Sequence, residues 1–399
     1  MSVYFKSNNK NLCCGCRGCE QVCPIGAISM LEDYEGFIYP DVNNDICINC
    51  GMCEKVCPIR DGGYKNPNSL QEPDVYGGVN KHNTILTDST SGGIFTAIIE
   101  SVFSGDDILV FGAEYDEDLV VRHNFIEKKN SISKLRGSKY VQSDLGNSYS
   151  KVKQFLIEGN KVIFSGTPCQ VAGLKSFLDI DYDNLFCIDI VCHGVPSPKV
   201  FEMYKEYLEN KMDSKLESIN FRDKSKRGWS NPYVVHNYKN GLKKYEFYSD
   251  DDFILGYNNS YYIRPICHTC PFARTPRVSD ITIADFWGAE ELSPSFKNSN
   301  GTSLFLINTN KGQAIYDSLQ NYSIIEKINL KDVMKFNPQL HRPTESNPER
   351  EAFMNDLKDG ATFEELKVKY LKKRPLIKRL ASRLLDKDTK NKIKKIIRK

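Results

Sequence analysis

The chain has 399 residues, and its composition of 40% hydrophobic and 26% charged residues is typical of a protein that buries a core. Its apolar runs are far shorter than the ~20 residues of a membrane-spanning helix, so none is predicted. The first residues lack the apolar stretch of a signal peptide. We therefore expect the fourteen cysteines in the reducing cytoplasm, where thiols serve metals or redox chemistry rather than disulfides.

The N-terminal part carries the densest cysteine pattern, C-x2-C-x2-C-x3-C-P, in two copies. This spacing is typical of bacterial ferredoxins, in which three cysteines of one copy bind a 4Fe-4S cluster together with the fourth cysteine of the other copy. We predict a two-cluster domain at residues 1–62. Zinc, the alternative for four-cysteine sites, does not require the x3-Cys-Pro ending. The predicted ligands are Cys13, Cys16, Cys19 and Cys57 for the first cluster and Cys47, Cys50, Cys53 and Cys23 for the second. Cys14 falls outside the spacing and is predicted to be a bystander.

A linker rich in Gly, Pro, Asn and Ser is predicted at 63–74, and apolar strands alternate with helical segments after it. Strands are expected at 107–113, 161–166 and 184–192, and helices at 148–160 and 197–212. Ser197 and Pro198 suit the start of the last helix as N-cap and first helical residue. The predicted fold class is an α+β ferredoxin-like domain followed by a larger α/β domain and a basic helical C-terminal tail.

Two predicted junctions between a strand and a helix carry residues that favour the binding of an anion or a metal. Ser91, Gly92 and Gly93 precede an apolar helix whose free backbone N–H groups favour an anion, although an ordinary capped helix explains the same pattern. Cys169 lies in the first turn of another helix, where a thiolate or a metal ligand is favoured.

Six sequence blocks follow one another in this larger region. They are TDSTSGGIFTAI (87–98), GSKYVQSDLG (137–146), FSGTPCQVAGLKSFL (164–178), DIVCHGVPSP (189–198), NFRDK (220–224) and CHTCPFARTPRVSDITIADFWG (267–288). In this order they resemble the coenzyme F420 hydrogenase/dehydrogenase beta subunit family. The resemblance implies a flavin and iron–sulfur domain at 75–345 that passes electrons between clusters and a small acceptor through FAD. Ala284 is the one departure noted, because many members have Gly there.

The family also implies a further cluster in this domain, and the remaining cysteines suggest its ligands. Cys267 and Cys270 form a C-x2-C pair in a loop, whereas Cys187 lies among apolar residues and is predicted to be a core thiol. The predicted ligands of a third 4Fe-4S cluster are Cys169, Cys192, Cys267 and Cys270. Zinc and unliganded thiols are the alternatives.

The flavin needs its pyrophosphate neutralised and its ring held. The residues predicted to hold the phosphates are Ser91, Gly92, Gly93, Lys139, Arg222 and Lys224. Those expected beside the ring or the ribityl chain are Tyr140, Gln142 and Trp287. The candidate proton donors are His193, Asp285 and Tyr140, and the flavin N5 carries the hydride. Without the resemblance, the segment 221–227 is equally well explained as a solvated basic loop.

The tail at 346–399 is strongly basic. Residues 367–399 contain fifteen Lys and Arg against two Asp, which gives +13 in a chain of net charge +3. One interpretation is peripheral contact with the anionic inner membrane face, and the other is a packed or frayed terminal helix. Nucleic acid is not an expected partner, because no aromatic residues interleave the charges.

The predicted function is an oxidoreductase. A donor such as ferredoxin or a partner oxidoreductase would feed the N-terminal clusters, and a small organic acceptor would receive electrons from FAD. The resemblance suggests coenzyme F420 or envelope polysaccharide metabolism for that acceptor. The alternative is an electron-relay subunit that serves a separate partner enzyme.

Overall fold

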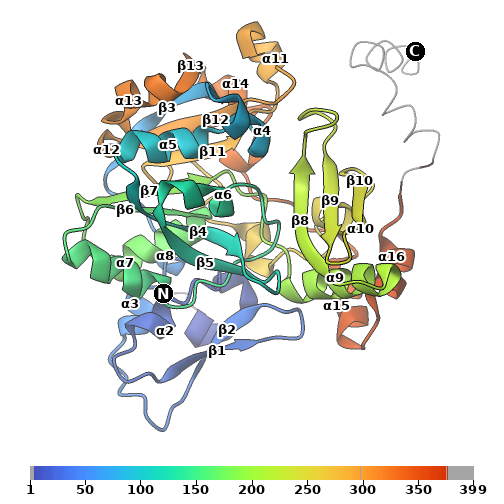
Figure 1. Ribbon diagram of the computed structural model, residues 1–399. Coiled ribbons are helices and arrows are strands. Elements are labelled where there is room, and N and C mark those ends of the chain that lie inside the picture. The colour runs from blue at the N-terminus through green and yellow to red at the C-terminus, as the bar shows by residue number, and fades with distance from the viewer. Residues whose placement is uncertain (1–3, 297, 374, 376–399) are drawn as a thin grey trace.

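The computed structural model describes residues 4–296, 298–373 and 375, which form three adjoining parts (Figure 1). A small part with a two-stranded hairpin comes first. An eight-stranded sheet with helices follows, and a three-stranded sheet with its own helices lies beside it. The chain is therefore a mixed α/β protein with a large mixed sheet and a ferredoxin-like N-terminal region.

The N-terminal part is built around a hairpin with cysteine-bearing loops on either side. β1 pairs antiparallel with β2, with Ile28 opposite Val42. The short helices α2 and α3 follow Arg17 and Gly51, whose φ angles of 57° and 71° are left-handed, so the chain turns sharply beside the cysteines. The elements of this part are α1 (Tyr4–Ser7), η1 (Lys10–Leu12), α2 (Gly18–Val22), β1 (Ile28–Glu32), β2 (Ile38–Val42), α3 (Met52–Lys55) and η2 (Arg60–Gly62).

The large sheet has the strand order β13-β3-β12-β11-β7-β6-β4-β5. Its strands are β3 (Ser69–Asn80), β4 (Asp107–Tyr115), β5 (Val121–Lys128), β6 (Val162–Gly166), β7 (Leu185–Ile190), β11 (Ile281–Asp285), β12 (Ser303–Thr309) and β13 (Ser323–Lys327). Strands β4, β6, β7 and β11 run parallel, whereas β5, β12, β3 and β13 pair antiparallel with their neighbours. The parallel centre requires crossover connections, and helices provide them.

Successive side chains of the central strands enter different cores, which explains their unbroken apolar runs. In β7, Phe186 and Ile188 pack with α5 and α13, whereas Leu185 and Cys187 pack with α7 and α8. A strand has a side-chain period of two, so a strand covered on both faces needs apolar residues at every position. The helices and turns of this part are α4 (Asn83–Asp88), α5 (Ile94–Val102), η3 (Lys129–Ser131), α6 (Ile132–Leu135), α7 (Ser148–Ile157), α8 (Pro168–Leu178), α11 (Ala289–Leu292), η5 (Pro294–Phe296), α12 (Asn310–Gln313), α13 (Tyr316–Tyr322), α14 (Leu330–Met334) and η6 (Pro338–Leu340). The strands expected at 107–113, 161–166 and 184–192 and the helix expected at 148–160 are confirmed as β4, β6, β7 and α7.

The segment assigned to a linker, 63–74, is in part a strand. β3 begins at Ser69, so the expected boundary between 74 and 75 falls inside it. The Asn66 side chain donates a hydrogen bond to the Val278 carbonyl oxygen at 3.1 Å, and β3 then pairs with β12 and β13. A Gly- and Pro-rich composition predicts turns but cannot reveal a strand partner far along the chain.

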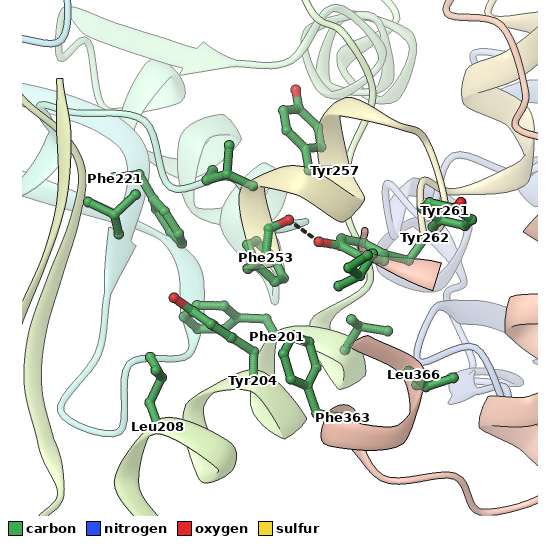
Figure 2. Packing of buried hydrophobic residues seen from close by; sticks show 14 of the residues in the cluster. Phe201, Tyr204, Leu208, Phe221, Phe253, Tyr257, Tyr261, Tyr262, Phe363 and Leu366 are labelled. Atoms are coloured by element: carbon green, nitrogen blue, oxygen red, sulfur yellow. Dashed lines mark hydrogen bonds between the residues drawn. The ribbon is translucent and has the colours of Figure 1, made fainter. Parts of the chain in front are cut away.

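The third part is a helical and β lobe with an aromatic core. Figure 2 shows Phe201 and Tyr204 of α9, Phe253 of α10 and Phe363 of α16 packed together, with the Tyr262 hydroxyl donating to the Phe253 carbonyl oxygen. Fully burying one such side chain contributes about 1.5–3 kcal/mol. The elements are α9 (Pro198–Met212), β8 (Leu216–Asp223), β9 (Tyr233–Tyr238), β10 (Lys243–Phe247), α10 (Asp252–Asn258), η4 (Pro265–Thr269), α15 (Arg350–Lys358) and α16 (Phe363–Tyr370).

The ends of this lobe bear on two sequence predictions. The Ser197 side chain accepts a hydrogen bond from the Val200 backbone N–H, which confirms Ser197 as the N-cap of α9. Helices α15 and α16 belong to the segment assigned to a tail, and both contribute buried residues to the aromatic core. The basic end of the tail, at 376–399, lies outside the described residues. No helix within 4–296 or 298–373 combines the length and the apolar character needed to cross a bilayer.

Candidate functional site

The carboxyl ends of the parallel strands bring predicted site residues to one edge of the large sheet. Cys169 follows β6, Cys192 follows β7 and Asp285 ends β11, and these strands run parallel. β3 ends at the same edge, because Ser303 of β12 lies opposite both Asp285 and Gly78. Ligands of open α/β sheets bind outside the carboxyl ends of the strands, so this edge is the candidate site.

The first group of cysteines encloses a small cavity. Its lining includes Cys13, Cys16, Cys19 and Cys57. Burial, followed by the nearby Cys16 thiol, raises the pKa of Cys57 to about 12. The Gly15 backbone N–H donates a hydrogen bond to the Cys13 Sγ at 3.4 Å, a contact of the kind that tunes cluster thiolates. The structure thus places Cys57, from the second cysteine run, with three cysteines of the first run, the grouping that the spacing predicts.

The second group of cysteines is partly open to solvent. Its predicted members are Cys47, Cys50, Cys53 and Cys23. Cys50 is exposed, and the side chain of Ile48 beside it is 62% exposed. Burial raises the pKa of Cys53, with Cys50 as a smaller cause. The Ala27 backbone N–H donates to the Cys23 Sγ at 3.2 Å.

The four cysteines predicted to bind a third cluster meet near the edge of the large sheet. Burial and then the Cys169 thiol raise the pKa of Cys192 to about 12, and the same two causes raise that of Cys270 to about 11. Burial raises the pKa of the Cys267 thiol, and so do Cys192, Cys270 and Cys169. Cys267 therefore lies near all three other members of the group. The Gly194 backbone N–H donates to the Cys192 Sγ at 3.3 Å. Three separate segments therefore bring four interacting thiols together.

The surroundings of this third group fit an anionic iron–sulfur cluster. Arg277 is buried, and its Nη2 donates to the Ile190 carbonyl oxygen at 3.0 Å and to the Asp189 Oδ2 at 3.2 Å. The same guanidinium lowers the pKa of Cys192 and Cys270, although burial outweighs it. A buried cation offsets the negative charge that four thiolates bring to a cluster. In the described part of the chain, no three His, Cys, Asp or Glu side chains close on a point where a single metal ion would sit.

Cys187 stands apart from the third group. It is fully buried, and its electrostatic neighbours are Lys175 and Asp280 rather than other predicted ligands. Burial raises its pKa to about 12. This placement matches the prediction of a core thiol.

Cys14, which the spacing leaves outside the ligand sets, is buried near two predicted ligands. Hydrogen bonding to Cys16 and then to Cys169 raises the pKa of Cys14 well above its ordinary value. The same hydrogen bonds lower the pKa of Cys16 and bring that of Cys169 to about 7. The Cys14 thiol therefore connects a predicted ligand of the first cluster with one of the third, a long-range contact that ligand spacing cannot predict.

Arg222 lies at the centre of a group of predicted flavin residues. Its Nη1 is 3.2 Å from the Tyr140 Oη and 3.4 Å from the Asp285 Oδ2. Its guanidinium carbon lies 5.8 Å from the ring centre of Trp287 and 6.0 Å from that of Trp229, and the two indole rings are 4.6 Å apart. The Arg222 Nε is buried without a hydrogen-bond partner among the described residues, and Trp287 is 45% exposed. An unpartnered buried donor beside an open aromatic face suits a planar polar ligand such as a flavin.

The N-terminus of α5 lies next to this group. Gly93, with φ 78°, precedes the helix and provides no side-chain cap, so the N–H groups of the first turn have no side-chain acceptor. Lys224 donates from Nζ to the Ser91 carbonyl oxygen at 2.8 Å, and burial lowers its pKa to about 8. A Cβ on Gly92 would lie 2.3 Å from the Gly78 carbonyl oxygen, so only glycine fits there. These residues fit an anion such as a phosphate group.

Two predicted flavin residues point elsewhere. Lys139 donates to the carbonyl oxygens of Lys134 and Arg136, and burial lowers its pKa to about 7. The Gln142 side chain donates from Nε2 to the Cys14 carbonyl oxygen at 3.0 Å. Gln142 therefore faces the first cysteine run rather than Arg222.

The three candidate proton donors occupy different positions. Tyr140 and Asp285 both contact Arg222. The His193 ring lies 5.2 Å from the ring of Tyr257, which is 5.1 Å from that of Tyr140. Burial lowers the pKa of His193, and its Nε2 has no hydrogen-bond partner among the described residues. His193 therefore lies between the third cysteine group and the aromatic side chains around Arg222.

Comparisons with known proteins agree with the cysteine pattern and the sequence blocks. Residues 12–60 match the model of a 4Fe-4S dicluster domain, and residues 159–333 match the model of the C terminus of the coenzyme F420 hydrogenase/dehydrogenase beta subunit. A search of curated proteins finds no match. A chain of the xenon-derivatised F420-reducing [NiFe] hydrogenase complex from Methanosarcina barkeri is 17% identical over 71% of this chain and 99% of its own, with a TM-score of 0.44. The resemblance is confirmed for these two parts of the chain: a 4Fe-4S dicluster domain precedes a region that matches the C terminus of the coenzyme F420 hydrogenase/dehydrogenase beta subunit.

Proposed function

We propose that the chain is an iron–sulfur flavoprotein oxidoreductase that takes electrons from a ferredoxin-type donor and passes them to a small organic acceptor. The observation that carries this proposal is the position of the third cysteine group. Cys169 lies in the first turn of α8, the helix that packs through Gly173 against Cys16 of the first ferredoxin group. His193 and Tyr257 lie between the third group and Tyr140. A third cluster there would lie between the ferredoxin domain and the flavin. FAD, when bound, accepts electrons singly and delivers a hydride.

The chain's own residues have distinct roles in this proposal. Arg222 and Lys224 supply positive charge to the flavin phosphates or the acceptor, and Ser91, Gly92 and Gly93 offer the N-terminus of α5. The exposed face of Trp287 stacks on a planar ring. The proton donors to be tested are Tyr140, Asp285 and His193.

An electron-relay subunit is the second candidate function. Arg222 contacts both Tyr140 and Asp285, so two of the three candidate donors are occupied by one cation. The exposed loop with Cys50 would then receive electrons from one protein, and the flavin edge would give them to another.

The composition of the purified protein separates these functions. Anaerobically purified protein is expected to contain about twelve irons and one flavin per chain, with little zinc. Eight irons with flavin would remove the third cluster, and eight irons without flavin would contradict an enzyme built from this chain alone. Reoxidation of the reduced flavin by coenzyme F420, and by sugar precursors of envelope polysaccharides, would then test the acceptors that the resemblance suggests.

A pair of variants tests where the flavin binds. Arg222→Met is expected to release flavin while the iron content stays unchanged. Arg227→Met is the matched control, because Arg227 follows β8, the strand that carries Arg222, but lies over Phe247, 5.6 Å from its ring centre. Equal flavin retention in both variants would contradict the assignment of Arg222.

A further inference from the structure

Arg264 is a completely buried cation whose side chain reaches into the ferredoxin domain. Its Nε donates to the Cys13 carbonyl oxygen at 2.8 Å, and its Nη2 donates to the Ile38 carbonyl oxygen at 2.8 Å. Its Nη2 also lies 3.6 Å from the Cys13 Sγ, and its guanidinium carbon is 4.4 Å from the ring centre of Tyr39. One side chain therefore fixes both a predicted ligand of the first cluster and β2 of the hairpin.

The backbone of Arg264 is hydrogen-bonded to the segments that carry the third cysteine group. Arg264 immediately precedes η4, and its carbonyl oxygen accepts a hydrogen bond from the Cys267 N–H at 2.9 Å. Its own N–H donates to the Val195 carbonyl oxygen at 3.0 Å, close to the turn that carries Cys192. Moving Arg264 would therefore shift ligands of both groups relative to one another.

Gln142 completes the connection. Its Oε1 accepts a hydrogen bond from the Arg264 Nη1 at 3.0 Å, and its Nε2 donates to the Cys14 carbonyl oxygen at 3.0 Å. A Cβ on Gly15 would lie 2.7 Å from the Arg264 Nη1, so the backbone here packs directly on the guanidinium. The segment with Gln142 also carries Tyr140, which contacts Arg222.

The second cysteine group differs in its surroundings. Its loop faces solvent, with Cys50 and Ile48 exposed. The first group, in contrast, is held against the larger domain by the buried Arg264, whose Nε donates to the Cys13 carbonyl oxygen at 2.8 Å. The two groups thus differ in the direction from which another redox centre can approach.

We propose that electrons leave the ferredoxin domain from the first cluster site, and that Arg264 is the positioning residue that holds this site against the third cysteine group. The inference rests on the iron–sulfur part of the proposed function and not on the substrate. Each transfer moves one electron and no proton. The reductant is an iron–sulfur donor that reaches the exposed second site, and the oxidant is the flavin. The Arg264 charge also favours the more negative, reduced state at Cys13.

The test is an EPR-monitored redox titration of the anaerobic holoprotein. Arg264→Met is expected to shift one cluster potential to a more negative value, and the shifted signal should be the one that Cys13→Ala removes. Arg264→Lys keeps the charge but cannot make the same fork of hydrogen bonds, so the potential should stay near that of the wild type. With Lys, flavin reduction by a reduced ferredoxin should slow roughly tenfold because the two sites lose their alignment.

Two further variants keep the test decisive. Gln142→Leu removes the bridge to Cys14 without touching the charge, and it should slow flavin reduction as Arg264→Lys does even if Arg264→Met fails to load iron. Glu35→Gln is the control, because it removes the 2.6 Å ion pair with Arg350 that also joins the two parts of the chain. This control should leave every cluster potential unchanged.

The outcomes distinguish this inference from the proposed function. A wild-type protein without iron–sulfur signals would overturn the proposed function and this inference with it. A wild-type protein with its signals present, in which Arg264→Met leaves all potentials unchanged or shifts only the signal that Cys50→Ser removes, would overturn this inference alone.

Discussion

Replacing Gly173 with alanine tests how closely α8, the helix that carries Cys169, packs on the first cysteine run. A Cβ at this position would lie 2.6 Å from the Tyr149 Oη, 3.1 Å from the Cys16 Cβ and 3.2 Å from the Cys16 Sγ. Tyr149 is fully buried, so its ring has no free space to enter. The substitution therefore sets a gain in helix propensity against a steric clash at the contact between the two domains.

The expected cost of the clash is larger than the gain in helix propensity. Alanine is better than glycine in a helix interior by about 1 kcal/mol. The Tyr149 hydroxyl donates to the Gln170 carbonyl oxygen at 2.7 Å, and losing this bond in a buried place costs about 1–3 kcal/mol. Repacking the ring costs about another 1–3 kcal/mol. Gly173→Ala should therefore lower stability by about 1–5 kcal/mol.

A second background makes the reasoning refutable. Tyr149→Phe removes the atom closest to the new methyl group, so Gly173→Ala should cost at least about 1 kcal/mol less in this background than in the wild type. The assay is the apparent midpoint of thermal unfolding, followed by circular dichroism under anaerobic conditions. An equal effect in both backgrounds, or a raised midpoint in the wild-type background, would show that α8 does not pack on Tyr149 as described.

Two other substitutions test the raised pKa of the buried Asp251 and the close packing of Gly92 against the large sheet. Burial raises the pKa of Asp251 to about 7, so between about pH 4 and 7 the folded chain keeps a proton that the unfolded chain releases, and this contribution to stability falls as pH rises. Asp251→Asn removes this pH dependence. Its free energy of unfolding, measured with urea, should rise relative to that of the wild type by about 1.4 kcal/mol per pH unit from about pH 5 to 7. A difference between the two proteins that does not change with pH would contradict the raised pKa. Gly92→Ala would place a Cβ 2.3 Å from the Gly78 carbonyl oxygen and 2.5 Å from the Ser303 nitrogen, so a loss of about 3 kcal/mol or more is expected in the same assay. Gly105→Ala, which meets no atom within 4 Å, is the control, and equal stability of the two variants would contradict the close packing.

Local patterns predicted the strands and helices, because these depend on short-range spacing. The repeated C-x2-C-x2-C-x3-C-P motif already paired Cys57 with the first run, and the structure places it in that cavity. The apolar runs of β6 and β7 follow from burial on both faces of a parallel sheet. Cys169 and Cys192 follow β6 and β7, and because these strands are parallel, both cysteines lie at the same edge of the sheet.

Contacts between distant segments were beyond the reach of the sequence. Arg264 precedes Pro265 in an ordinary-looking stretch, and nothing local indicates that its side chain reaches Cys13. Cys14 does not fit the ligand spacing, and only the fold reveals that it meets Cys169. Gln142 lies in a block tied by resemblance to the flavin, yet its amide bonds to the backbone of the cysteine run.

The central claim is a third cluster between the ferredoxin domain and the flavin, and the iron content of one pair of variants tests it most directly. Cys270→Ser should reduce the content from about twelve irons to about eight and remove one EPR signal of the reduced protein. Cys187→Ala, which changes a buried thiol of the same domain outside the group, should keep about twelve. Twelve irons in Cys270→Ser, or an equal loss in both variants, would contradict the claim.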